Sequence, residues 1–241
     1  MRLRFFKPAF LALLLAQAMY PSLAQTGFPF SEDESLRYAV NWPSGLTLGD
    51  ATFNAHRTKD GWIFSASVNA GLPGFAIADQ FHSKVTGSDF CSTNFERDLT
   101  HGGKHTIDKT EFDQEQHTAK RTTTLPDGGG KTSYDIPSCA HDALAFVYLT
   151  RREMGQGRMP PGQPVYFGSS YSVSLQYTGE QDLKSPGTGG KTAVTDKVVG
   201  SVKGPQSTFQ FEIYFARDPQ RTPLAVRIPT NLGTIALELV R

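Results

Sequence analysis

The sequence contains two histidines at a spacing that could place metal ligands beside a turn. His101 and His105 flank the dipeptide Gly102-Gly103. On one extended strand, residues four apart would stand about 13 Å from each other, too far to share a zinc ion. The zinc-site spacings H-E-x-x-H and C-x-x-C do not occur in the chain. We therefore predict that these are solvated strand or loop histidines and that there is no metal site.

The tetrapeptide Gly-Gly-Lys-Thr occurs twice, at residues 129–132 and 189–192, and suggests a phosphate-binding loop. A P-loop requires a further glycine five residues before the glycine that precedes the lysine, and it must open a helix. Leu125 and Ser185 occupy the positions of that further glycine. We predict a hairpin turn at both motifs and no nucleotide site. The nucleophile motif G-x-S-x-G is also absent from the sequence.

Paired carboxylates are the remaining route to catalysis, because glycoside hydrolysis uses two acids at a defined separation. The sequence does not place any two carboxylates together, and a carboxylate on a strand or turn is usually a solvated one. We therefore expect no catalytic residue and no cofactor. The candidate carboxylates are Asp89, Glu96, Asp98, Asp142 and Asp218.

Most of the chain alternates apolar and polar residues, which is the pattern of strands with one buried face. Turn-forming glycine, proline and aspartate residues separate the alternating runs. Short strands with regular turns predict an antiparallel meander. The clearest alternating runs are 36–42, 62–68, 171–177, 209–215, 224–228 and 235–239.

One segment, near residues 139–154, follows a helical period instead. Residues there, including Tyr148 and Arg151, recur at steps of three and four. Ser138 is the expected N-cap, and glycines at 155 and 157 should end the helix. One helix cannot cover the apolar faces of about a dozen strands, so the sheet must curl or pack on itself. The predicted fold is mainly β: a curved antiparallel sheet (half-barrel, barrel or sandwich) packed with a single α-helix.

Residues 1–24 have the parts of a secretory signal peptide. Basic residues precede an uninterrupted apolar run at 8–16, and small residues follow it. We predict cleavage between Ala24 and Gln25, which would leave a single mainly-β domain, 25–241, in the periplasm. The apolar run is about half of the ~20 residues that cross a bilayer. No cysteine directly follows it, so we expect neither a membrane span nor a lipid anchor.

Charge and cysteine content limit the function further. The leader holds three of the 24 Lys and Arg residues and none of the 23 Asp and Glu residues, which leaves 21 against 23 and a net charge of −2. This balance disfavours a nucleic-acid partner. Cys91 and Cys139 are the only cysteines. In an oxidising compartment they predict a disulfide, with two buried thiols as the alternative.

Three groups of motifs resemble an uncharacterised bacterial envelope family, domain of unknown function 3108. The first is Leu-Arg-Tyr-Ala-Val-Asn-Trp at 36–42, followed by Gly45 and Gly49. The second is Pro-Ser-Cys-Ala-His-Asp-Ala-Leu at 137–144, with Tyr148 and Arg151 after it. The third is Tyr-Phe-Ala-Arg-Asp at 214–218, with Arg-Thr-Pro at 221–223 and Leu-Glu-Leu at 237–239. The resemblance implies an envelope location and a mainly β fold, and it implies no catalytic residues.

The leading functional hypothesis is a non-enzymatic binder or carrier of an apolar envelope ligand, such as a lipid or lipid-linked precursor. The excess of apolar strand faces over helix leaves room for a cavity lined by aromatic residues. Arg151 or Arg221 would anchor an anionic headgroup. A glycan-active enzyme that uses carboxylates and an envelope assembly or scaffold subunit are the alternatives. The candidate ligand-binding residues are Trp42, Asp142, Tyr148, Arg151, Asp218 and Arg221.

Overall fold

The computed structural model describes residues 28–72, 74–205, 207–230 and 233–240. The predicted signal peptide and its cleavage site between Ala24 and Gln25 lie outside the described residues. Within these ranges the chain forms fifteen strands, one α-helix and one short 3-10 helix.

The first half of the described chain consists of consecutive antiparallel strands. They are β1 (Asp33–Asn41), β2 (Thr47–Arg57), β3 (Gly61–Leu72), β4 (Phe75–Thr86), β5 (Cys91–His101), β6 (Lys104–Asp113), β7 (Thr118–Leu125) and β8 (Gly128–Asp135).

The second half contains both helices and the remaining strands. In chain order these are β9 (His141–Asp142), α1 (Ala143–Gly155), β10 (Gln163–Tyr166), β11 (Ser170–Lys184), the 3-10 helix η1 (Pro186–Thr188), β12 (Thr192–Lys203), β13 (Thr208–Ala216), β14 (Pro223–Thr230) and β15 (Gly233–Val240).

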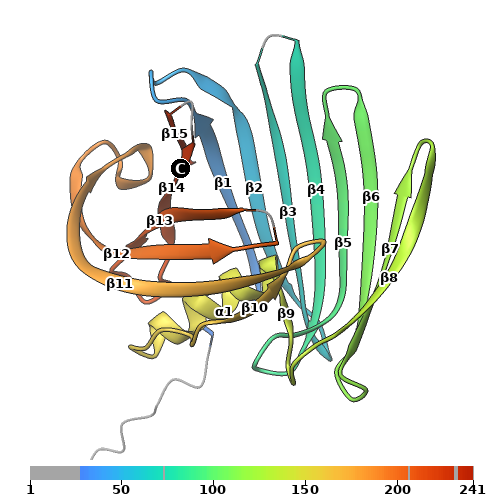
Figure 1. Ribbon diagram of the computed structural model, residues 1–241. Helices are drawn as coiled ribbons and strands as arrows, with labels where there is room; N and C mark the ends of the chain where they lie inside the picture. Colours follow the sequence, from blue (N-terminus) through green and yellow to red (C-terminus); the bar gives the residue numbers. More distant parts are fainter. Residues whose placement is uncertain (1–27, 73, 206, 231–232, 241) are drawn as a thin grey trace, which may run out of the picture.

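All fifteen strands belong to one sheet, whose order is β8-β7-β6-β5-β4-β3-β2-β1-β15-β14-β13-β12-β11-β10-β9. Neighbouring strands are antiparallel except β9 and β10, which are parallel. The pairing of β1 with β15 joins the two halves of the chain. In Figure 1 the first eight strands run side by side, and β11–β13 cross in front of α1 in a different direction. The sheet therefore curves around the helix.

This architecture confirms the predicted fold class: a mainly β chain with one α-helix and a curved antiparallel sheet. The sheet is open, since β8 and β9 form its two edges and do not pair with each other. Helix α1 packs against β3, β4, β9 and β10. The helix therefore lies on the concave side and contacts both halves of the sheet.

The largest core cluster is the aromatic packing between α1 and the first strands. Trp62 and Phe64 of β3 and Tyr148 of α1 are each at most 2% exposed. Phe30, which precedes β1, lies 5.1 Å from the Trp62 ring and 5.0 Å from the Tyr148 ring, centroid to centroid. Aromatic contacts of this kind add to the energy of apolar burial. This cluster holds the helix in a fixed position beneath the sheet.

Two local predictions were wrong. The N-cap of α1 is Asp142 rather than Ser138, because residues 137–142 are first tied to the sheet by β9 and by a disulfide at Cys139. The motif at 129–132 lies inside β8, because the two-residue turn between β7 and β8 comes earlier, at 126–127. The motif at 189–192 does form a turn, between η1 and β12.

Candidate functional site

A cavity of about 240 Å³ lies between α1 and the sheet. Its wall draws on α1, on β1 and β2, and on β11 and β13–β15, so both halves of the sheet contribute. Apart from Thr150 and Arg151, every lining residue is aromatic or aliphatic. Small-ligand sites have this composition, with a few polar groups in an apolar wall. The lining residues are Leu36, Tyr38, Phe53, Phe146, Val147, Tyr148, Thr150, Arg151, Leu175, Phe211, Ile213, Phe215, Pro223, Val226, Ile228 and Leu237.

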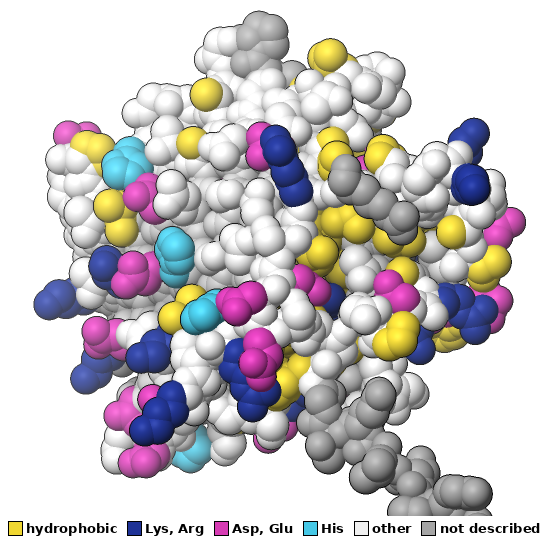
Figure 2. Space-filling model, turned by 180° about the vertical axis from the view of Figure 1, so that it is seen from behind, with side chains coloured by type: hydrophobic (Ala, Val, Ile, Leu, Met, Phe, Trp, Pro, Cys, Tyr) yellow, Lys and Arg dark blue, Asp and Glu magenta, His cyan; other side chains and the backbone are white. Residues whose placement is uncertain are grey.

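The strand register brings these side chains together. Ile213 on β13 lies opposite Val226 on β14, which in turn lies opposite Leu237 on β15. Within β13 the cavity residues are 211, 213 and 215, because successive side chains of a strand point to opposite faces. The alternation that predicted the strands therefore also directs their apolar faces into the cavity. In Figure 2, hydrophobic side chains gather to the right of the centre of this face, whereas the histidines lie on its left-hand half.

Arg151 is the charged residue of the cavity wall, and its side chain is 1% exposed. Its guanidinium donates two hydrogen bonds to Glu34, from Nη1 to Oε2 at 2.5 Å and from Nη2 to Oε1 at 2.9 Å. Nη2 also donates to the backbone carbonyl of Gln220 at 3.1 Å. The guanidinium carbon lies 5.0 Å from the ring centroid of Phe30. Glu34 therefore neutralises the charge, and the pair ties α1 to β1.

Two tyrosines line the cavity with hydroxyls in different situations. Tyr38 Oη donates to the backbone carbonyl of Pro223 at 2.9 Å. Tyr148 stacks on Phe64 with ring centroids 4.0 Å apart, but its Oη has no hydrogen-bond partner among the described residues. The Nε of Arg151 is likewise buried without an acceptor in the described part of the chain. The cavity wall thus contains two unused donors.

Burial controls the ionisation of both tyrosines. It raises the pKa of Tyr38 and of Tyr148 far above the usual value, and the nearby positive charge of Arg151 opposes this rise only in part. A tyrosine whose pKa is raised keeps its proton. The Tyr148 hydroxyl is therefore a hydrogen-bond donor throughout the physiological pH range.

Asp142 lies at the start of α1, outside the cavity wall, and is fully buried. One carboxylate oxygen accepts hydrogen bonds from the backbone N–H groups of Leu144 and Ala145 at 2.9 and 3.0 Å. The other accepts from the hydroxyls of Ser83 and Ser92 at 2.6 and 2.7 Å. Burial raises the pKa of Asp142, and these four hydrogen bonds act in the opposite direction. The carboxylate caps the helix and joins it to β4 and β5.

The model of the family described as Protein of unknown function (DUF3108) matches residues 37–240. The matched range includes the whole of α1 and all the strands that line the cavity, except for residues 33–36 of β1. The chain belongs to the DUF3108 family. The predicted family is therefore confirmed. No curated protein matches the sequence.

Two solved structures resemble this DUF3108 chain over most of its length. One is a protein with a YmcC-like fold from Bacteroides fragilis NCTC 9343 that is inferred to be exported; it is 8% identical, with a TM-score of 0.34, and the match covers 89% of this chain and 97% of that one. The other is an inferred lipoprotein from Parabacteroides distasonis ATCC 8503; it is 10% identical, with a TM-score of 0.31 and coverage of 88% and 95%.

Two wider features of the DUF3108 chain bear on the sequence predictions. None of the helices in the described ranges is long and apolar enough to cross a membrane. The same ranges contain no group of three or more histidine, cysteine or acidic side chains that could hold a metal ion. His101 and His105 instead each approach one carboxylate, Asp79 at 3.0 Å and Asp98 at 2.7 Å.

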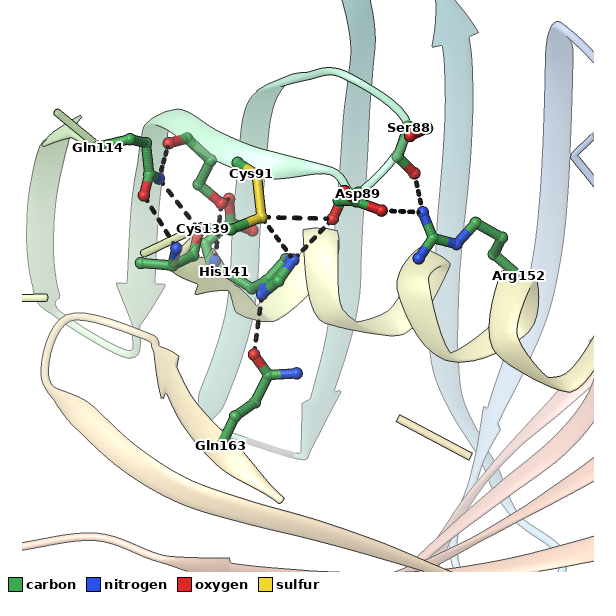
Figure 3. Close-up of a disulfide and its surroundings, with 11 residues drawn as sticks. Ser88, Asp89, Cys91, Gln114, Cys139, His141, Arg152 and Gln163 are labelled. Atoms are coloured by element: carbon green, nitrogen blue, oxygen red, sulfur yellow. Dashed lines mark hydrogen bonds and ion pairs between the residues drawn. A yellow bond between two sulfur atoms is a disulfide. The ribbon is translucent and has the colours of Figure 1, made fainter. Parts of the chain in front are cut away.

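The segment that leads into α1 of this DUF3108 chain is held by a disulfide and a buried histidine (Figure 3). Cys91 and Cys139 form the predicted disulfide, which joins this segment to β5. His141 places Nδ1 3.0 Å from the Gln163 side-chain oxygen and Nε2 2.7 Å from the backbone carbonyl of Asp89. These contacts fix the position from which the helix starts.

Three of the predicted ligand-binding residues lie outside the cavity wall in addition to Asp142. Arg221 Nη1 pairs with Asp196 Oδ2 at 2.5 Å. Asp218 accepts hydrogen bonds from the backbone N–H and the hydroxyl of Thr222 at 3.2 and 3.1 Å. Trp42 follows β1, where its backbone N–H donates to a turn carbonyl. Asp218 and Trp42 therefore make local turn contacts, whereas Arg221 pairs with a buried residue of β12 outside the cavity wall.

Tyr148 and Arg151 are the predicted residues that the structure brings together at the cavity. Glu34, the partner of Arg151, was missed by the sequence reasoning. It precedes Leu36 and Tyr38 by two and four residues, and so lies on the same face of β1 as these two cavity residues. A carboxylate at a position whose side chain points to the buried face of a strand indicates that a buried cation lies opposite it.

Proposed function

We propose that this protein binds an apolar small molecule of the cell envelope in the cavity between α1 and the sheet, without chemical conversion. The observation that carries the proposal is the composition of the wall: fourteen of the sixteen lining residues are aromatic or aliphatic. Ligand pockets combine such a wall with a few polar groups that orient the bound molecule. A lipid, or a lipid-linked precursor that inserts one chain, belongs to the class of ligand that fits.

Two carboxylates, Glu34 beside the cavity and Asp142 at the start of α1, support binding rather than glycan hydrolysis. Glu34 is occupied by two hydrogen bonds from Arg151, and Asp142 already accepts four hydrogen bonds at the helix start. A glycosidase needs one acid free to protonate the leaving group and a second that attacks or activates water. Neither buried group has that freedom.

A periplasmic location completes the proposal. The amino terminus has the charge and hydropathy pattern of a cleaved signal peptide. The Cys91–Cys139 disulfide is the type of bond that persists in oxidising compartments such as the bacterial periplasm. Both features support the delivery of the chain to a place where envelope lipids are present.

The first test is the uptake of N-phenyl-1-naphthylamine, a neutral probe whose fluorescence rises in apolar surroundings. We expect saturable binding to the delipidated mature protein and a loss of binding in Val226→Trp, which places an indole in the cavity. Val194→Trp is the matched control, because Val194 is 48% exposed and does not line the cavity. Absence of saturable binding, or equal binding by both tryptophan variants, would contradict the proposal.

A second test identifies the natural ligand. Native mass spectrometry of protein purified from periplasm without detergent should show an added mass that organic solvent removes. The Val226→Trp protein prepared in the same way should lack that added mass, while Val194→Trp should retain it. An added mass that persists in Val226→Trp would place the ligand elsewhere on the molecule.

A further inference from the structure

The two unused donors of the cavity wall carry information about its ligand. Tyr148 and Arg151 are each 1% exposed, and Tyr148 Oη and Arg151 Nε have no acceptor among the described residues. Buried polar groups in folded proteins are nearly always hydrogen-bonded, so an unpaired one calls for an explanation. Here both unpaired groups are donors, and both belong to residues of a cavity. A ligand that brings an acceptor oxygen would satisfy them.

The charge of the site indicates what kind of oxygen this is. Arg151 is already neutralised by Glu34 through two hydrogen bonds. An anionic headgroup would therefore enter an apolar cavity next to the Glu34 carboxylate and without a free counter-charge. Burying an unpaired charge is far more costly than burying a neutral polar group that gains a hydrogen bond. An uncharged acceptor is therefore favoured over a carboxylate or phosphate.

The size of the cavity limits the rest of the ligand. Its volume of about 240 Å³ lies just below the lower end, about 300 Å³, of typical pockets for drug-sized molecules. A two-chain lipid does not fit within this volume. One chain, or the end of one chain, does.

Resting on the proposed function, we infer that the ligand is a single acyl chain with an uncharged carbonyl or ester oxygen, to which Tyr148 Oη and Arg151 Nε donate hydrogen bonds. Tyr148 and Arg151 then together distinguish an acyl ester from a hydrocarbon. Burial keeps the Tyr148 hydroxyl protonated by raising its pKa, so the donor is present at every pH at which the protein is used. Arg151 also has a structural role, because its pair with Glu34 ties α1 to β1.

The test compares three probes of similar chain length as competitors of N-phenyl-1-naphthylamine: methyl octanoate, octanoate and nonane. For wild type we expect methyl octanoate to bind about tenfold more tightly than nonane or octanoate, the factor expected when two hydrogen bonds each contribute about threefold. In Tyr148→Phe we expect the preference for methyl octanoate over nonane to fall to about threefold, the share that Arg151 Nε alone supplies, while nonane binding is unchanged. Equal affinities of the three probes for wild type would overturn the inference.

Tyr38→Phe is the matched control, since it removes a hydroxyl of the same cavity wall whose hydrogen is already donated to Pro223. It should keep the preference for the ester. A loss of preference in both variants would assign the effect to general cavity polarity and overturn the role of Tyr148. Because the proposed function requires only uptake of the neutral probe, a protein that binds nonane and the ester equally would retain that function while this inference fails.

Infrared spectroscopy of the bound ester separates a direct hydrogen bond from a general change in cavity structure, because the carbonyl frequency reports on that bond. The carbonyl band of bound, isotopically labelled methyl octanoate should lie at lower frequency in wild type and Tyr38→Phe than in Tyr148→Phe, because a donated hydrogen bond weakens the carbonyl bond. The same carbonyl frequency in all three proteins would show that Tyr148 does not contact the ester.

Discussion

The start of helix α1 and its cavity face both bury polar groups, but only the start satisfies them. At the start, Asp142 accepts four hydrogen bonds from Ser83, Ser92 and two backbone N–H groups. At the cavity face, Arg151 keeps Nε unpaired and Tyr148 keeps its hydroxyl unpaired within the described residues. The helix and its cap therefore have one polar group whose hydrogen bonds are all used in the fold and two groups that each keep an unused donor.

This difference distinguishes buried polar groups that stabilise the fold from buried polar groups that can bind a ligand. A buried carboxylate with every acceptor position used stabilises the fold and offers nothing to a ligand. A buried donor without an acceptor costs stability, so its presence is better explained by a partner that is absent from the isolated chain. Burial alone therefore does not identify the site, whereas the unmet hydrogen bonds next to an apolar cavity do. Variants at the two regions can test this comparison.

The largest effect is expected from breaking the ion pair at the cavity. Glu34→Ala leaves the guanidinium of Arg151 buried without its counter-charge, and Glu34 and Arg151 side chains are only 11% and 1% exposed. We expect a loss of about 4 kcal/mol in the free energy of unfolding, as for other buried pairs that lose one partner. Urea denaturation followed by tryptophan fluorescence measures this change.

The control for that variant removes both charges. The double substitution Glu34→Leu with Arg151→Met fills similar volume with apolar atoms, and we expect most of the stability to return because neither charge is then buried alone. If Glu34→Ala costs less than about 1 kcal/mol, the pair behaves as an exposed salt bridge, and the assignment of a neutralised arginine at the cavity is wrong.

The next effect concerns the start of the helix. Asp142→Ala removes the N-cap and leaves the two serine hydroxyls without their acceptor, and we expect a loss of about 2 kcal/mol in unfolding free energy. Asp142→Asn keeps an oxygen for the backbone N–H groups and should cost clearly less. Binding of N-phenyl-1-naphthylamine should survive in folded Asp142→Asn. A loss of that binding would mean that the helix start belongs to the ligand site after all.

A pH series compares wild type with Asp142→Asn. Burial raises the pKa of Asp142 in the folded state, so the folded protein binds this proton more tightly than the unfolded chain does. The contribution of Asp142 to stability is therefore complete below its unfolded pKa of about 4 and decreases as the pH rises through the folded value. We expect the unfolding free energy of wild type, relative to Asp142→Asn, to fall as the pH rises above about 4. A difference that rises with pH would show that the four hydrogen bonds outweigh burial.

The strands and the helix could be predicted from the sequence because each element repeats its own period. Alternation over 209–215 predicted β13, and the change of period near Tyr148 predicted α1. Strand β8 could not be found in this way, since Gly-Gly-Gly-Lys-Thr-Ser-Tyr-Asp has no alternating apolar face and nearly all of it is exposed. Its place in the sheet comes from pairing with β7.

The candidate site was only partly predictable for a related reason. Tyr148 and Arg151 follow from the helical period, but their partners come from distant strands: Glu34 lies 117 positions before Arg151. Whether a buried tyrosine donates or stays unpaired depends on such distant atoms. Neither the strand pattern around Tyr38 nor the helical pattern around Tyr148 shows what the hydroxyl contacts, and only the fold places the Pro223 carbonyl beside Tyr38.

The smallest effect is also the sharpest test of the comparison, because it concerns one oxygen atom in each of two tyrosines. Tyr38→Phe removes a hydrogen bond and should lower the unfolding free energy of the delipidated protein by about 1 kcal/mol. Tyr148→Phe removes a hydroxyl that has no partner among the described residues, and we expect no loss, or a gain of up to about 0.5 kcal/mol, since the cost of burying an unpaired group disappears. Parallel denaturation curves of the two variants decide the question. If Tyr148→Phe lowers the unfolding free energy as much as Tyr38→Phe does, the Tyr148 hydroxyl already has a hydrogen-bond partner within the protein and is not free to bind a ligand.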